Sequence, residues 1–358
     1  MITERDRLLV FLSLCEITNK KQEMLLNILE DFSIEKMLRN SEVESLFSAD
    51  EFHRMVLNYD GRALDSSIEN MQKSGIKILT IFSDDYPEKL INLPDKPLIL
   101  YAKGDLSLLN KQGFAIVGTR SPSSYGKMVT EKFAAELAQS GLVIISGLCY
   151  GVDEIAHRKT LEVGGKTIAV VGSGFKYIYP SVNTALSEEI AEKGLLLSEY
   201  YPSYKSRKYS FPRRNRIVAG LSDGVLITEA SFNSGTIHTK EFALEYGKDL
   251  FAVPGSIYSS KSELTNMMIK SAQSECVISP EDIIKYYGLE KKVEEEKVLE
   301  LNFEEQAILK FLEDGEKSFD FLKENLKLDT KILNYYLTTL EINALIKRLP
   351  AQFFALIK

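Results

Sequence analysis

The chain is poor in cysteine and histidine, and it has no long apolar run. Its 358 residues include three cysteines and three histidines, all widely spaced. An odd and scattered set of cysteines argues against a disulfide framework and a zinc cluster, and it fits a reducing compartment. No window approaches 18 uninterrupted apolar residues, and the first 20 residues lack the features of a signal peptide. We therefore expect a cytoplasmic protein with no membrane segment, no bound metal and no other cofactor.

Familiar catalytic and phosphate-binding signatures are also missing. Gly126 is followed by Lys-Met rather than Lys-Ser or Lys-Thr, which excludes a Walker loop, and the turn 118–126 is not the glycine-rich dinucleotide fingerprint. Asp153 and His157 share one helix face, but no nucleophile elbow accompanies them. We favour a helix cap at Asp153 and a packed histidine over an acid–base pair. We predict no catalytic residue and no enzyme activity.

Charge is unevenly distributed along the chain. The net charge of −7 argues against a protein that binds nucleic acid over its whole surface. Residues 1–110 carry 13 basic and 19 acidic residues, and residues 281–358 carry 12 and 16. Residues 111–253 carry 17 basic and 14 acidic residues. The central region alone is basic, so we expect an anionic partner to bind there.

The chain divides into four parts by pattern. Residues 1–75 predict short helices, which we interpret as a helical domain that is structural or contacts other proteins. Residues 76–288 predict the core, and residues 289–300 form a charged linker. Residues 301–358 predict three helices and a hairpin, which suggests a winged-helix domain. Its 8 basic and 9 acidic residues do not favour DNA, so we treat it as an accessory contact module.

The core alternates between short apolar runs and helical segments. The runs are FAIVG, LVIIS, TIAVV, LLLSEY, GVLIT and LFAV, and each is bounded by Gly, Ser or Thr. Continuous apolar strands joined by helices are typical of a parallel sheet that is covered on both faces. The predicted fold class is therefore α/β, with an extended Rossmann-like parallel sheet. Such sheets bind ligands at the carboxyl ends of their strands.

Three of the turns after these strands are suited to anions. The turn 118–126 contains Arg120, Ser146–Gly147 follows the second strand, and Ser234–Gly235–Thr236 begins a later helix. Backbone N–H groups at helix starts favour bound phosphate, and an arginine adds a fork of donors. For the first turn, a capped helix with a surface arginine is an equal alternative. Glu229 could bind a ribose hydroxyl or a basic neighbour.

The stretch from Tyr200 to Ser222 is the most informative. It holds six basic residues and no acidic one (Lys205, Arg207, Lys208, Arg213, Arg214 and Arg216). Five aromatic residues are interleaved with them (Tyr200, Tyr201, Tyr204, Tyr209 and Phe211). A charge run is usually only a solvated face, but basic side chains neutralise phosphates and aromatic rings stack on unpaired bases. We therefore favour binding of single-stranded nucleic acid here.

Six motifs follow one another through residues 85–285. They are YPEKL with LPDKPLILYAKG, AIVGTRSPSSYG, SGLCYGVDEIAH, SFPRRNRIVAGLS, EASFNSGTIHT and AVPG. Their order and spacing resemble the DprA/Smf family of DNA-processing proteins, and residues 301–358 resemble that family's C-terminal domain. The resemblance implies a homodimer that binds single-stranded DNA in a basic pocket. It also implies protection of incoming DNA and loading of the RecA recombinase during natural transformation.

The resemblance assigns DNA-binding roles to individual residues. The residues are Arg120, Ser146, Gly147, Lys208, Phe211, Arg213, Arg214, Asn215, Arg216, Ser234, Gly235 and Thr236. The chain also departs from the family pattern. Cys149-Tyr150 replaces the usual Ala-Arg, which removes one basic contact. In the segment 262–273, Leu264 and Ala272 replace glycines and Gln273 replaces alanine, so the resemblance does not fix the geometry of this loop.

A phosphoribosyl hydrolase of the related Rossmann-like fold is the alternative function. Those nucleotide-binding enzymes typically carry P-G-G-x-G-T-x-x-E at the third turn. Here the stretch is ASFNSGTIHT, which lacks the double glycine and has Thr239 in place of the glutamate. The sequence therefore favours a DNA-binding protein over an enzyme.

Overall fold

The computed structural model describes residues 2–289, 302–343 and 345–356. The chain forms two compact units, residues 1–292 and residues 293–358, and each is described by itself. The predicted linker 289–300 lies outside the described residues from residue 290 onward. Within the described ranges, no helix is long and apolar enough to cross a membrane.

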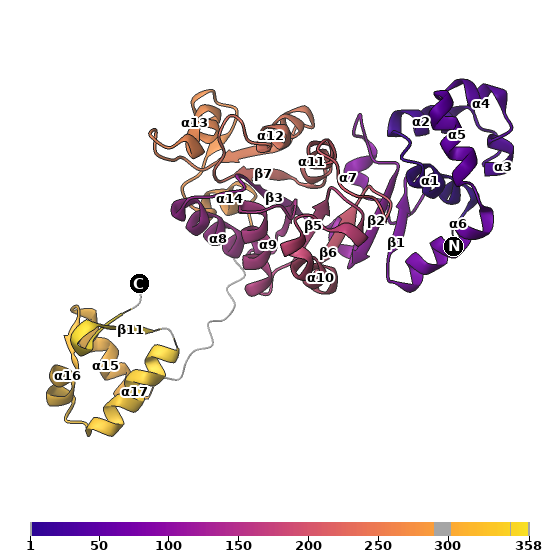
Figure 1. The fold of residues 1–358 in the computed structure, drawn as a ribbon. Coiled ribbons are helices and arrows are strands. Elements are labelled where there is room, and N and C mark those ends of the chain that lie inside the picture. The colour runs from indigo at the N-terminus through magenta and orange to yellow at the C-terminus, as the bar shows by residue number, and fades with distance from the viewer. Residues whose placement is uncertain (1, 290–301, 344, 357–358) are drawn as a thin grey trace. The chain divides into compact units, whose positions relative to one another are not determined.

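The larger unit is built on a nine-stranded sheet with the order β1-β2-β6-β5-β4-β3-β7-β8-β9 (Figure 1). The strands are β1 (Lys77–Thr80), β2 (Ile99–Gly104), β3 (Gly113–Val117), β4 (Val143–Ser146), β5 (Thr167–Val171), β6 (Leu195–Ser198), β7 (Gly224–Ile227), β8 (Asp249–Ala252) and β9 (Glu275–Cys276). The pairings from β6 to β9 are parallel, whereas β1 and β2 are antiparallel additions beside β6. The predicted α/β class with a parallel, Rossmann-like sheet is confirmed.

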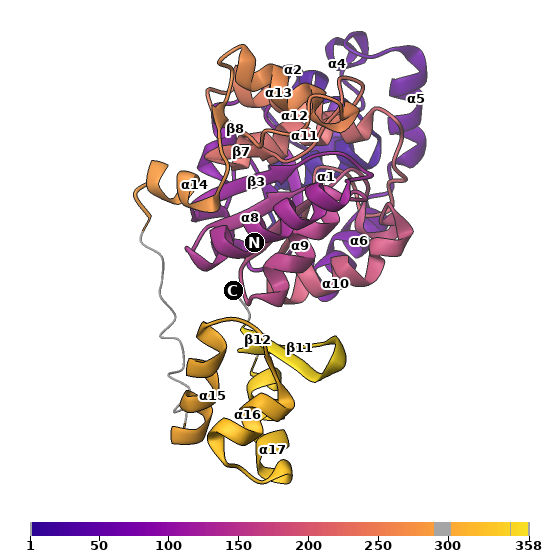
Figure 2. The same ribbon diagram turned by 90° about the vertical axis from the view of Figure 1, so that its left-hand side faces the viewer.

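Helices cover both faces of this sheet (Figure 1 and Figure 2). One face carries α8 (Ser124–Gln139), α9 (Val152–Glu162), α10 (Thr184–Lys193) and α14 (Pro280–Tyr286), and the other carries α7 (Glu88–Ile91), α11 (Ser210–Leu221), α12 (Thr236–Glu245) and α13 (Glu263–Lys270). Successive side chains of β3 point to opposite faces of the sheet. Phe114 and Ile116 belong to the core beneath α8, and Ala115 and Val117 belong to the core beneath α11. Burial on both faces explains why this strand is continuously apolar.

The strand order reverses between β3 and β7. From β3 the chain continues through β4, β5 and β6 on one side, and it then crosses to β7 and β8 on the other side. The connections leaving β3 and β7 therefore diverge, which opens a crevice at their carboxyl ends. Gly118 begins the turn after β3, and a Cβ there would lie 2.7 Å from Val152 Cγ2 and 2.8 Å from the carbonyl oxygen of Glu229. Only glycine fits this close approach.

Six helices precede the sheet and share a core with it. They are α1 (Glu4–Leu14), α2 (Asn19–Ile28), α3 (Ile34–Met37), α4 (Ser41–Ser45), α5 (Ala49–Asn58) and α6 (Gly61–Lys73). Leu98, Ile99 and Tyr101 are at most 1% exposed, and all three belong to the same apolar cluster as Leu9 of α1. Although the sequence suggests a separate domain up to residue 75, these helices belong to the same compact unit as the sheet.

The smaller unit has its own core. It contains α15 (Phe303–Glu313), α16 (Phe319–Leu326) and α17 (Thr330–Ile342), with an antiparallel sheet in the order β10-β12-β11 made of β10 (Lys317–Ser318), β11 (Ile346–Leu349) and β12 (Phe353–Leu356). Ile308, Leu337 and Phe354 are at most 1% exposed and pack together. β11 and β12 form the hairpin that the alternating C-terminal segments predict.

A buried histidine links α9 to β5. His157 is 0% exposed, and its Nδ1 lies 2.7 Å from the hydroxyl of Thr167. Asp153 lies in the first turn of α9, whose N-cap is Gly151, and its carboxylate accepts from the backbone N–H of Cys149 at 3.4 Å. The histidine is therefore a packed residue whose partner is a threonine. Burial lowers the pKa of His157 from 6.5 to about 3.

His157 makes the larger unit less stable in acid. Because its pKa in the folded state is lowered, the unfolded chain binds a proton below about pH 6.5 that the folded chain does not. This residue alone should cost about 1.4 kcal/mol of unfolding free energy per pH unit as the pH falls from about 6 to 4. Urea unfolding at several pH values should show a shallower acid dependence for His157→Gln. The variant His53→Gln, at an exposed site, should keep the parental dependence. Identical dependence in all three proteins would contradict this account.

Candidate functional site

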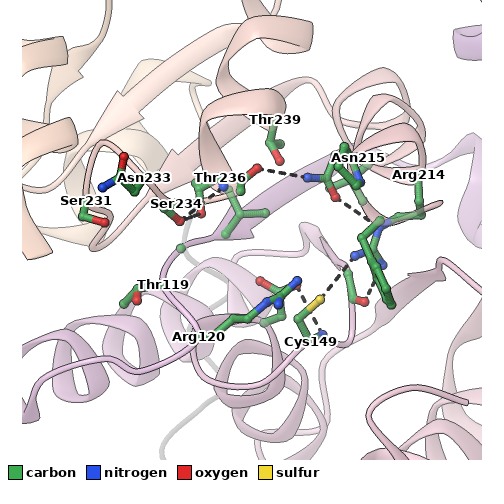
Figure 3. Close-up of a pocket in the computed structure, with 18 of the residues that line it drawn as sticks. Thr119, Arg120, Cys149, Arg214, Asn215, Ser231, Asn233, Ser234, Thr236 and Thr239 are labelled. Atoms are coloured by element: carbon green, nitrogen blue, oxygen red, sulfur yellow. Dashed lines mark hydrogen bonds between the residues drawn. The ribbon is translucent and has the colours of Figure 1, made fainter. Parts of the chain in front are cut away.

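A pocket of about 580 Å³ lies in the crevice at the carboxyl ends of β3 and β7 (Figure 3). Its lining comes from the loops after β3, β4, β5, β6 and β7 and from residues of α9, α11 and α12. The lining residues are Val117, Gly118, Thr119, Arg120, Gly147, Cys149, Asp153, Tyr179, Lys208, Phe211, Pro212, Arg214, Asn215, Val218, Ser231, Asn233, Ser234, Gly235, Thr236 and Thr239. Nine of the twelve predicted site residues are therefore in one place, and Ser146, Arg213 and Arg216 are not.

Two cations are available at the pocket. Arg120 follows β3, Lys208 precedes α11, and both side chains are exposed. Among the residues that the structure describes, no carboxylate forms an ion pair with either one. The sequence places them 88 positions apart, and the fold brings them to one cavity because both follow strand ends at the same edge. Two unpaired cations in one pocket are suited to a phosphate backbone.

Two aromatic rings, those of Phe211 and Tyr179, lie beside these cations. Phe211 is half-buried, and the guanidinium carbon of Arg120 lies 5.8 Å from the centre of its ring. The ring of Tyr179 lies 5.3 Å from that of Phe211 at an interplanar angle of 54°. Sequence reasoning identified Phe211 but missed Tyr179, which is 48% exposed and comes from the loop after β5. The sequence signal that could have identified Tyr179 is its position in the loop after a predicted strand.

Arg214 forms the floor of the pocket. Its side chain is 2% exposed, and its guanidinium donates to the carbonyl oxygens of Gly147 and Val170 and, at 3.5 Å, to the Sγ of Cys149. A Cβ at Gly147 would lie 2.3 Å from Arg214 Nη2, so this glycine makes room for the guanidinium. Burial raises the pKa of Asp153, and the charge of Arg214 acts against that rise. Arg214 therefore supports the site from below.

Arg213 and Arg216 point away from the pocket, contrary to the roles that the resemblance assigned. Arg213 Nη2 lies 3.5 Å from Glu199 Oε1. Arg216 is 2% exposed and forms ion pairs with the same carboxylate and with Asp95. Residues three apart share a helix face, whereas Arg214 and Asn215 lie on the opposite side of α11. Counting charges along the sequence cannot tell which basic residues of α11 face the pocket and which face away from it.

The start of α12 contributes polar groups to the pocket. Ser234 and Thr236 share a hydrogen bond between their hydroxyls at 2.9 Å, and the N–H of Thr236 donates to Ser234 Oγ. Asn215 reaches across from α11 and donates to the carbonyl of Gly235 at 3.4 Å, as Figure 3 shows. A side chain at Gly235 would meet open space. The third predicted turn thus faces the cavity.

Ser146 of the second turn and the helix start of the first turn have structural roles instead. Ser146 is 0% exposed and donates to the carbonyl of Ile116 at 2.7 Å. Glu229 is 2% exposed and accepts from the N–H of Ser123 at 2.8 Å and from its hydroxyl at 2.6 Å. Ser123 is the N-cap of α8. The protein's own carboxylate therefore occupies the helix start at which we expected an anion, and Glu229 is not among the residues that line the pocket.

The tyrosines of the basic stretch do not line the pocket. Tyr200 and Tyr204 are at most 9% exposed, and their rings stack on each other with centres 4.4 Å apart. Tyr201 packs edge-on against Tyr101 of β2. Tyr209 is 52% exposed, but it lies at a separate small cavity beside the N-terminal helices. Phe211 is the one aromatic residue of this stretch in the pocket lining.

Comparison with known proteins identifies relatives of this chain. The DNA processing protein DprA of Bacillus subtilis is 43% identical over 188 residues, which cover 52% of this chain and 63% of the relative. The match thus spans less than two thirds of that protein. An X-ray structure of DprA from Streptococcus pneumoniae superimposes with a TM-score of 0.69 at 33% identity, and it covers 79% of this chain and 98% of the other.

A second solved structure concerns the DNA processing protein A of Helicobacter pylori, described for its unique single-stranded DNA binding mode. It has a TM-score of 0.55 and 36% identity, with coverage of 59% of this chain and 95% of that one. The family model described as DNA recombination-mediator protein A matches residues 77–288, more than half of the chain. These residues include the whole parallel sheet and every residue that lines the pocket. The chain belongs to the DprA/Smf family of DNA-processing proteins.

Proposed function

We propose that this protein binds single-stranded DNA in the pocket at the carboxyl ends of β3 and β7. The observation that carries the proposal is the meeting of two unpaired cations, Arg120 and Lys208, with the half-buried ring of Phe211. The Helicobacter pylori relative, which is described for its single-stranded DNA binding mode, supports it. The cations hold consecutive phosphates, and the ring of Phe211 stacks on a base. A duplex has no unstacked base that could stack on the ring of Phe211.

Membership of the family suggests a wider role. We propose that the protein protects incoming single strands in the cytoplasm and helps to load the RecA recombinase during natural transformation. We further propose that residues 302–356 are a winged helix that serves as an accessory contact module. A RecA strand-exchange assay on DNA coated with single-strand binding protein tests the loading role. No stimulation by this protein would count against it.

We propose that the protein forms a homodimer through exposed apolar side chains that follow β8. Ile257 and Tyr258 are 83% and 94% exposed, and Met267 of α13 is 45% exposed. Large apolar side chains with this exposure are suited to contact with a second copy of the chain. Gel filtration should report a dimer that Tyr258→Asp weakens. A monomer at all concentrations would refute the dimer.

We propose that the protein is not an enzyme. Asp153 is the one carboxylic acid in the described pocket lining, and it is buried against Arg214. Thr239 lines the pocket at the position where the related phosphoribosyl hydrolases carry a glutamate. The pocket therefore lacks an exposed acid to protonate or attack a glycosidic bond. Release of free base from nucleoside monophosphates by the purified protein would contradict this proposal.

Removal of the two cations tests the phosphate contacts. Arg120→Ala and Lys208→Ala should each weaken binding of every single-stranded sequence, because phosphate contacts are independent of base identity. Each should also make the dependence of log K on log salt shallower, by about 0.7 for each phosphate that the protein no longer neutralises. Anisotropy titrations at several salt concentrations measure both effects. Lys127→Ala removes an exposed cation of the same basic region outside the pocket lining and should keep the parental slope. A double variant with the parental slope would refute these contacts.

Removal of the aromatic ring separates stacking from charge. Phe211→Ala should cost about 1–3 kcal/mol of binding free energy. The salt slope should stay close to the parental value, because stacking releases no counterions. Phe232→Ala is the matched control, since Phe232 is 46% exposed but does not line the pocket. Circular dichroism and a melting curve establish that the variant is folded. A folded Phe211→Ala protein with undiminished affinity would exclude a stacking role.

A further inference from the structure

The loop 199–209 connects β6 to α11 and carries Lys208 to the edge of the pocket. Three contacts attach this loop to the N-terminal helices. Arg207 Nη2 lies 2.7 Å from Glu16 Oε2, just beyond α1. The other two contacts join Asn19 Nδ2 of α2 to Glu199 Oε1 at 2.7 Å, and Ser67 Oγ of α6 to the hydroxyl of Tyr201 at 2.5 Å. The loop is thus tied to the N-terminal helices at two residues near its start and at the residue before Lys208.

Aromatic packing reinforces these contacts. The ring of Tyr201 meets that of Tyr101, which is fully buried between β2 and the N-terminal helices, at 5.9 Å. The hydroxyl of Tyr204 donates to that of Tyr209 at 3.1 Å, and the guanidinium of Arg207 lies 5.7 Å from the Tyr204 ring. These tyrosines are therefore part of the attachment. A loop with this composition would otherwise sample many conformations, because it has no regular secondary structure between β6 and α11.

We propose that the N-terminal helices position Lys208 and Phe211 for single-stranded DNA through Glu16, Asn19 and Ser67. The inference rests on the proposed function. Lys208 immediately follows the residue that Glu16 holds, and Phe211 lies in the first turn of α11 directly after the loop. None of the three N-terminal residues lines the pocket, and each of them bonds to the loop. Their effect is to lower the conformational entropy that the loop loses when DNA binds.

A purely electrostatic role for Glu16 predicts the opposite change in DNA affinity. Glu16 is an acidic residue on a protein that binds a polyanion, and its removal makes the net charge less negative. If Glu16 acted only through its charge, Glu16→Ala would tighten binding of DNA and would leave Arg207 free to contact phosphate. If it positions the loop, the same substitution weakens binding. The direction of the change in affinity therefore decides between the two.

The experiment uses the full chain and a fluorescent single-stranded oligonucleotide. Glu16→Ala keeps the Cβ, so the backbone at φ 57° is unaffected. Glu16→Ala and Ser67→Ala should each weaken binding roughly two- to fivefold, and the double variant more than either. The salt slope should not change, because the protein still neutralises the same phosphates. Hydrogen exchange of the backbone amides in 199–209 should be faster in both variants. Glu44→Ala, which removes an exposed acid on α4 with no contact to the loop, should not weaken binding.

The possible outcomes separate this inference from the proposed function. Unchanged or tighter binding by the folded Glu16→Ala and Ser67→Ala proteins, while Arg120→Ala binds weakly, would overturn the positioning role alone. Parental affinity in Arg120→Ala and Lys208→Ala as well would overturn the proposed function. If Glu16→Ala lowers the melting temperature, Ser67→Ala supplies the decisive comparison, because removing one partly buried hydroxyl leaves the helices packed. Weaker binding with faster loop exchange at an unchanged melting temperature supports the inference.

Discussion

The site depends on how Glu229 connects two strand ends. Its carboxylate accepts from the N–H and hydroxyl of Ser123, and its carbonyl accepts from the N–H of Thr119 at 2.7 Å. A Cβ at Gly126 would lie 2.1 Å from Glu229 Oε2, so this glycine leaves space for the carboxylate. The turn between β3 and α8 is thereby tied to the end of β7 at several points. Arg120 lies within that turn, so the hydrogen bonds of Glu229 hold in place the backbone that carries Arg120.

The distribution of charge explains how an acidic protein offers a site for an anion. Three arginines close to the pocket are neutralised or held by the protein itself. Arg213 and Arg216 share the carboxylate of Glu199, and Arg214 donates to backbone carbonyls beneath the floor. Arg120 and Lys208 remain exposed beside the cavity. Among the described residues that line the pocket, these two are the exposed cations, so in the proposed complex the salt dependence of DNA binding reports on them.

The sequence predicted the sheet well because parallel strands are buried on both faces and read as short apolar runs. It also predicted that Arg120 and Lys208 meet, since both follow strand ends at one edge of the sheet. It could not predict the direction of side chains on α11, where Arg213 and Arg216 turn to Glu199, a residue before the basic stretch. Nor could it show that Tyr200 and Tyr204 lie at a small cavity beside the N-terminal helices, because the two segments are far apart in the sequence. Local composition identifies the chemistry available, and long-range packing decides which groups face the ligand.

We propose that the pocket binds a strand whose bases are unstacked. Competition between a single-stranded oligonucleotide and a duplex of equal length tests it most directly. A chain that ends at residue 289 is the suitable protein, because residues 2–289 belong to one compact unit and the smaller unit then contributes nothing. We expect tighter binding of the single strand, with the preference reduced by Phe211→Ala. Equal or stronger binding of the duplex would contradict it.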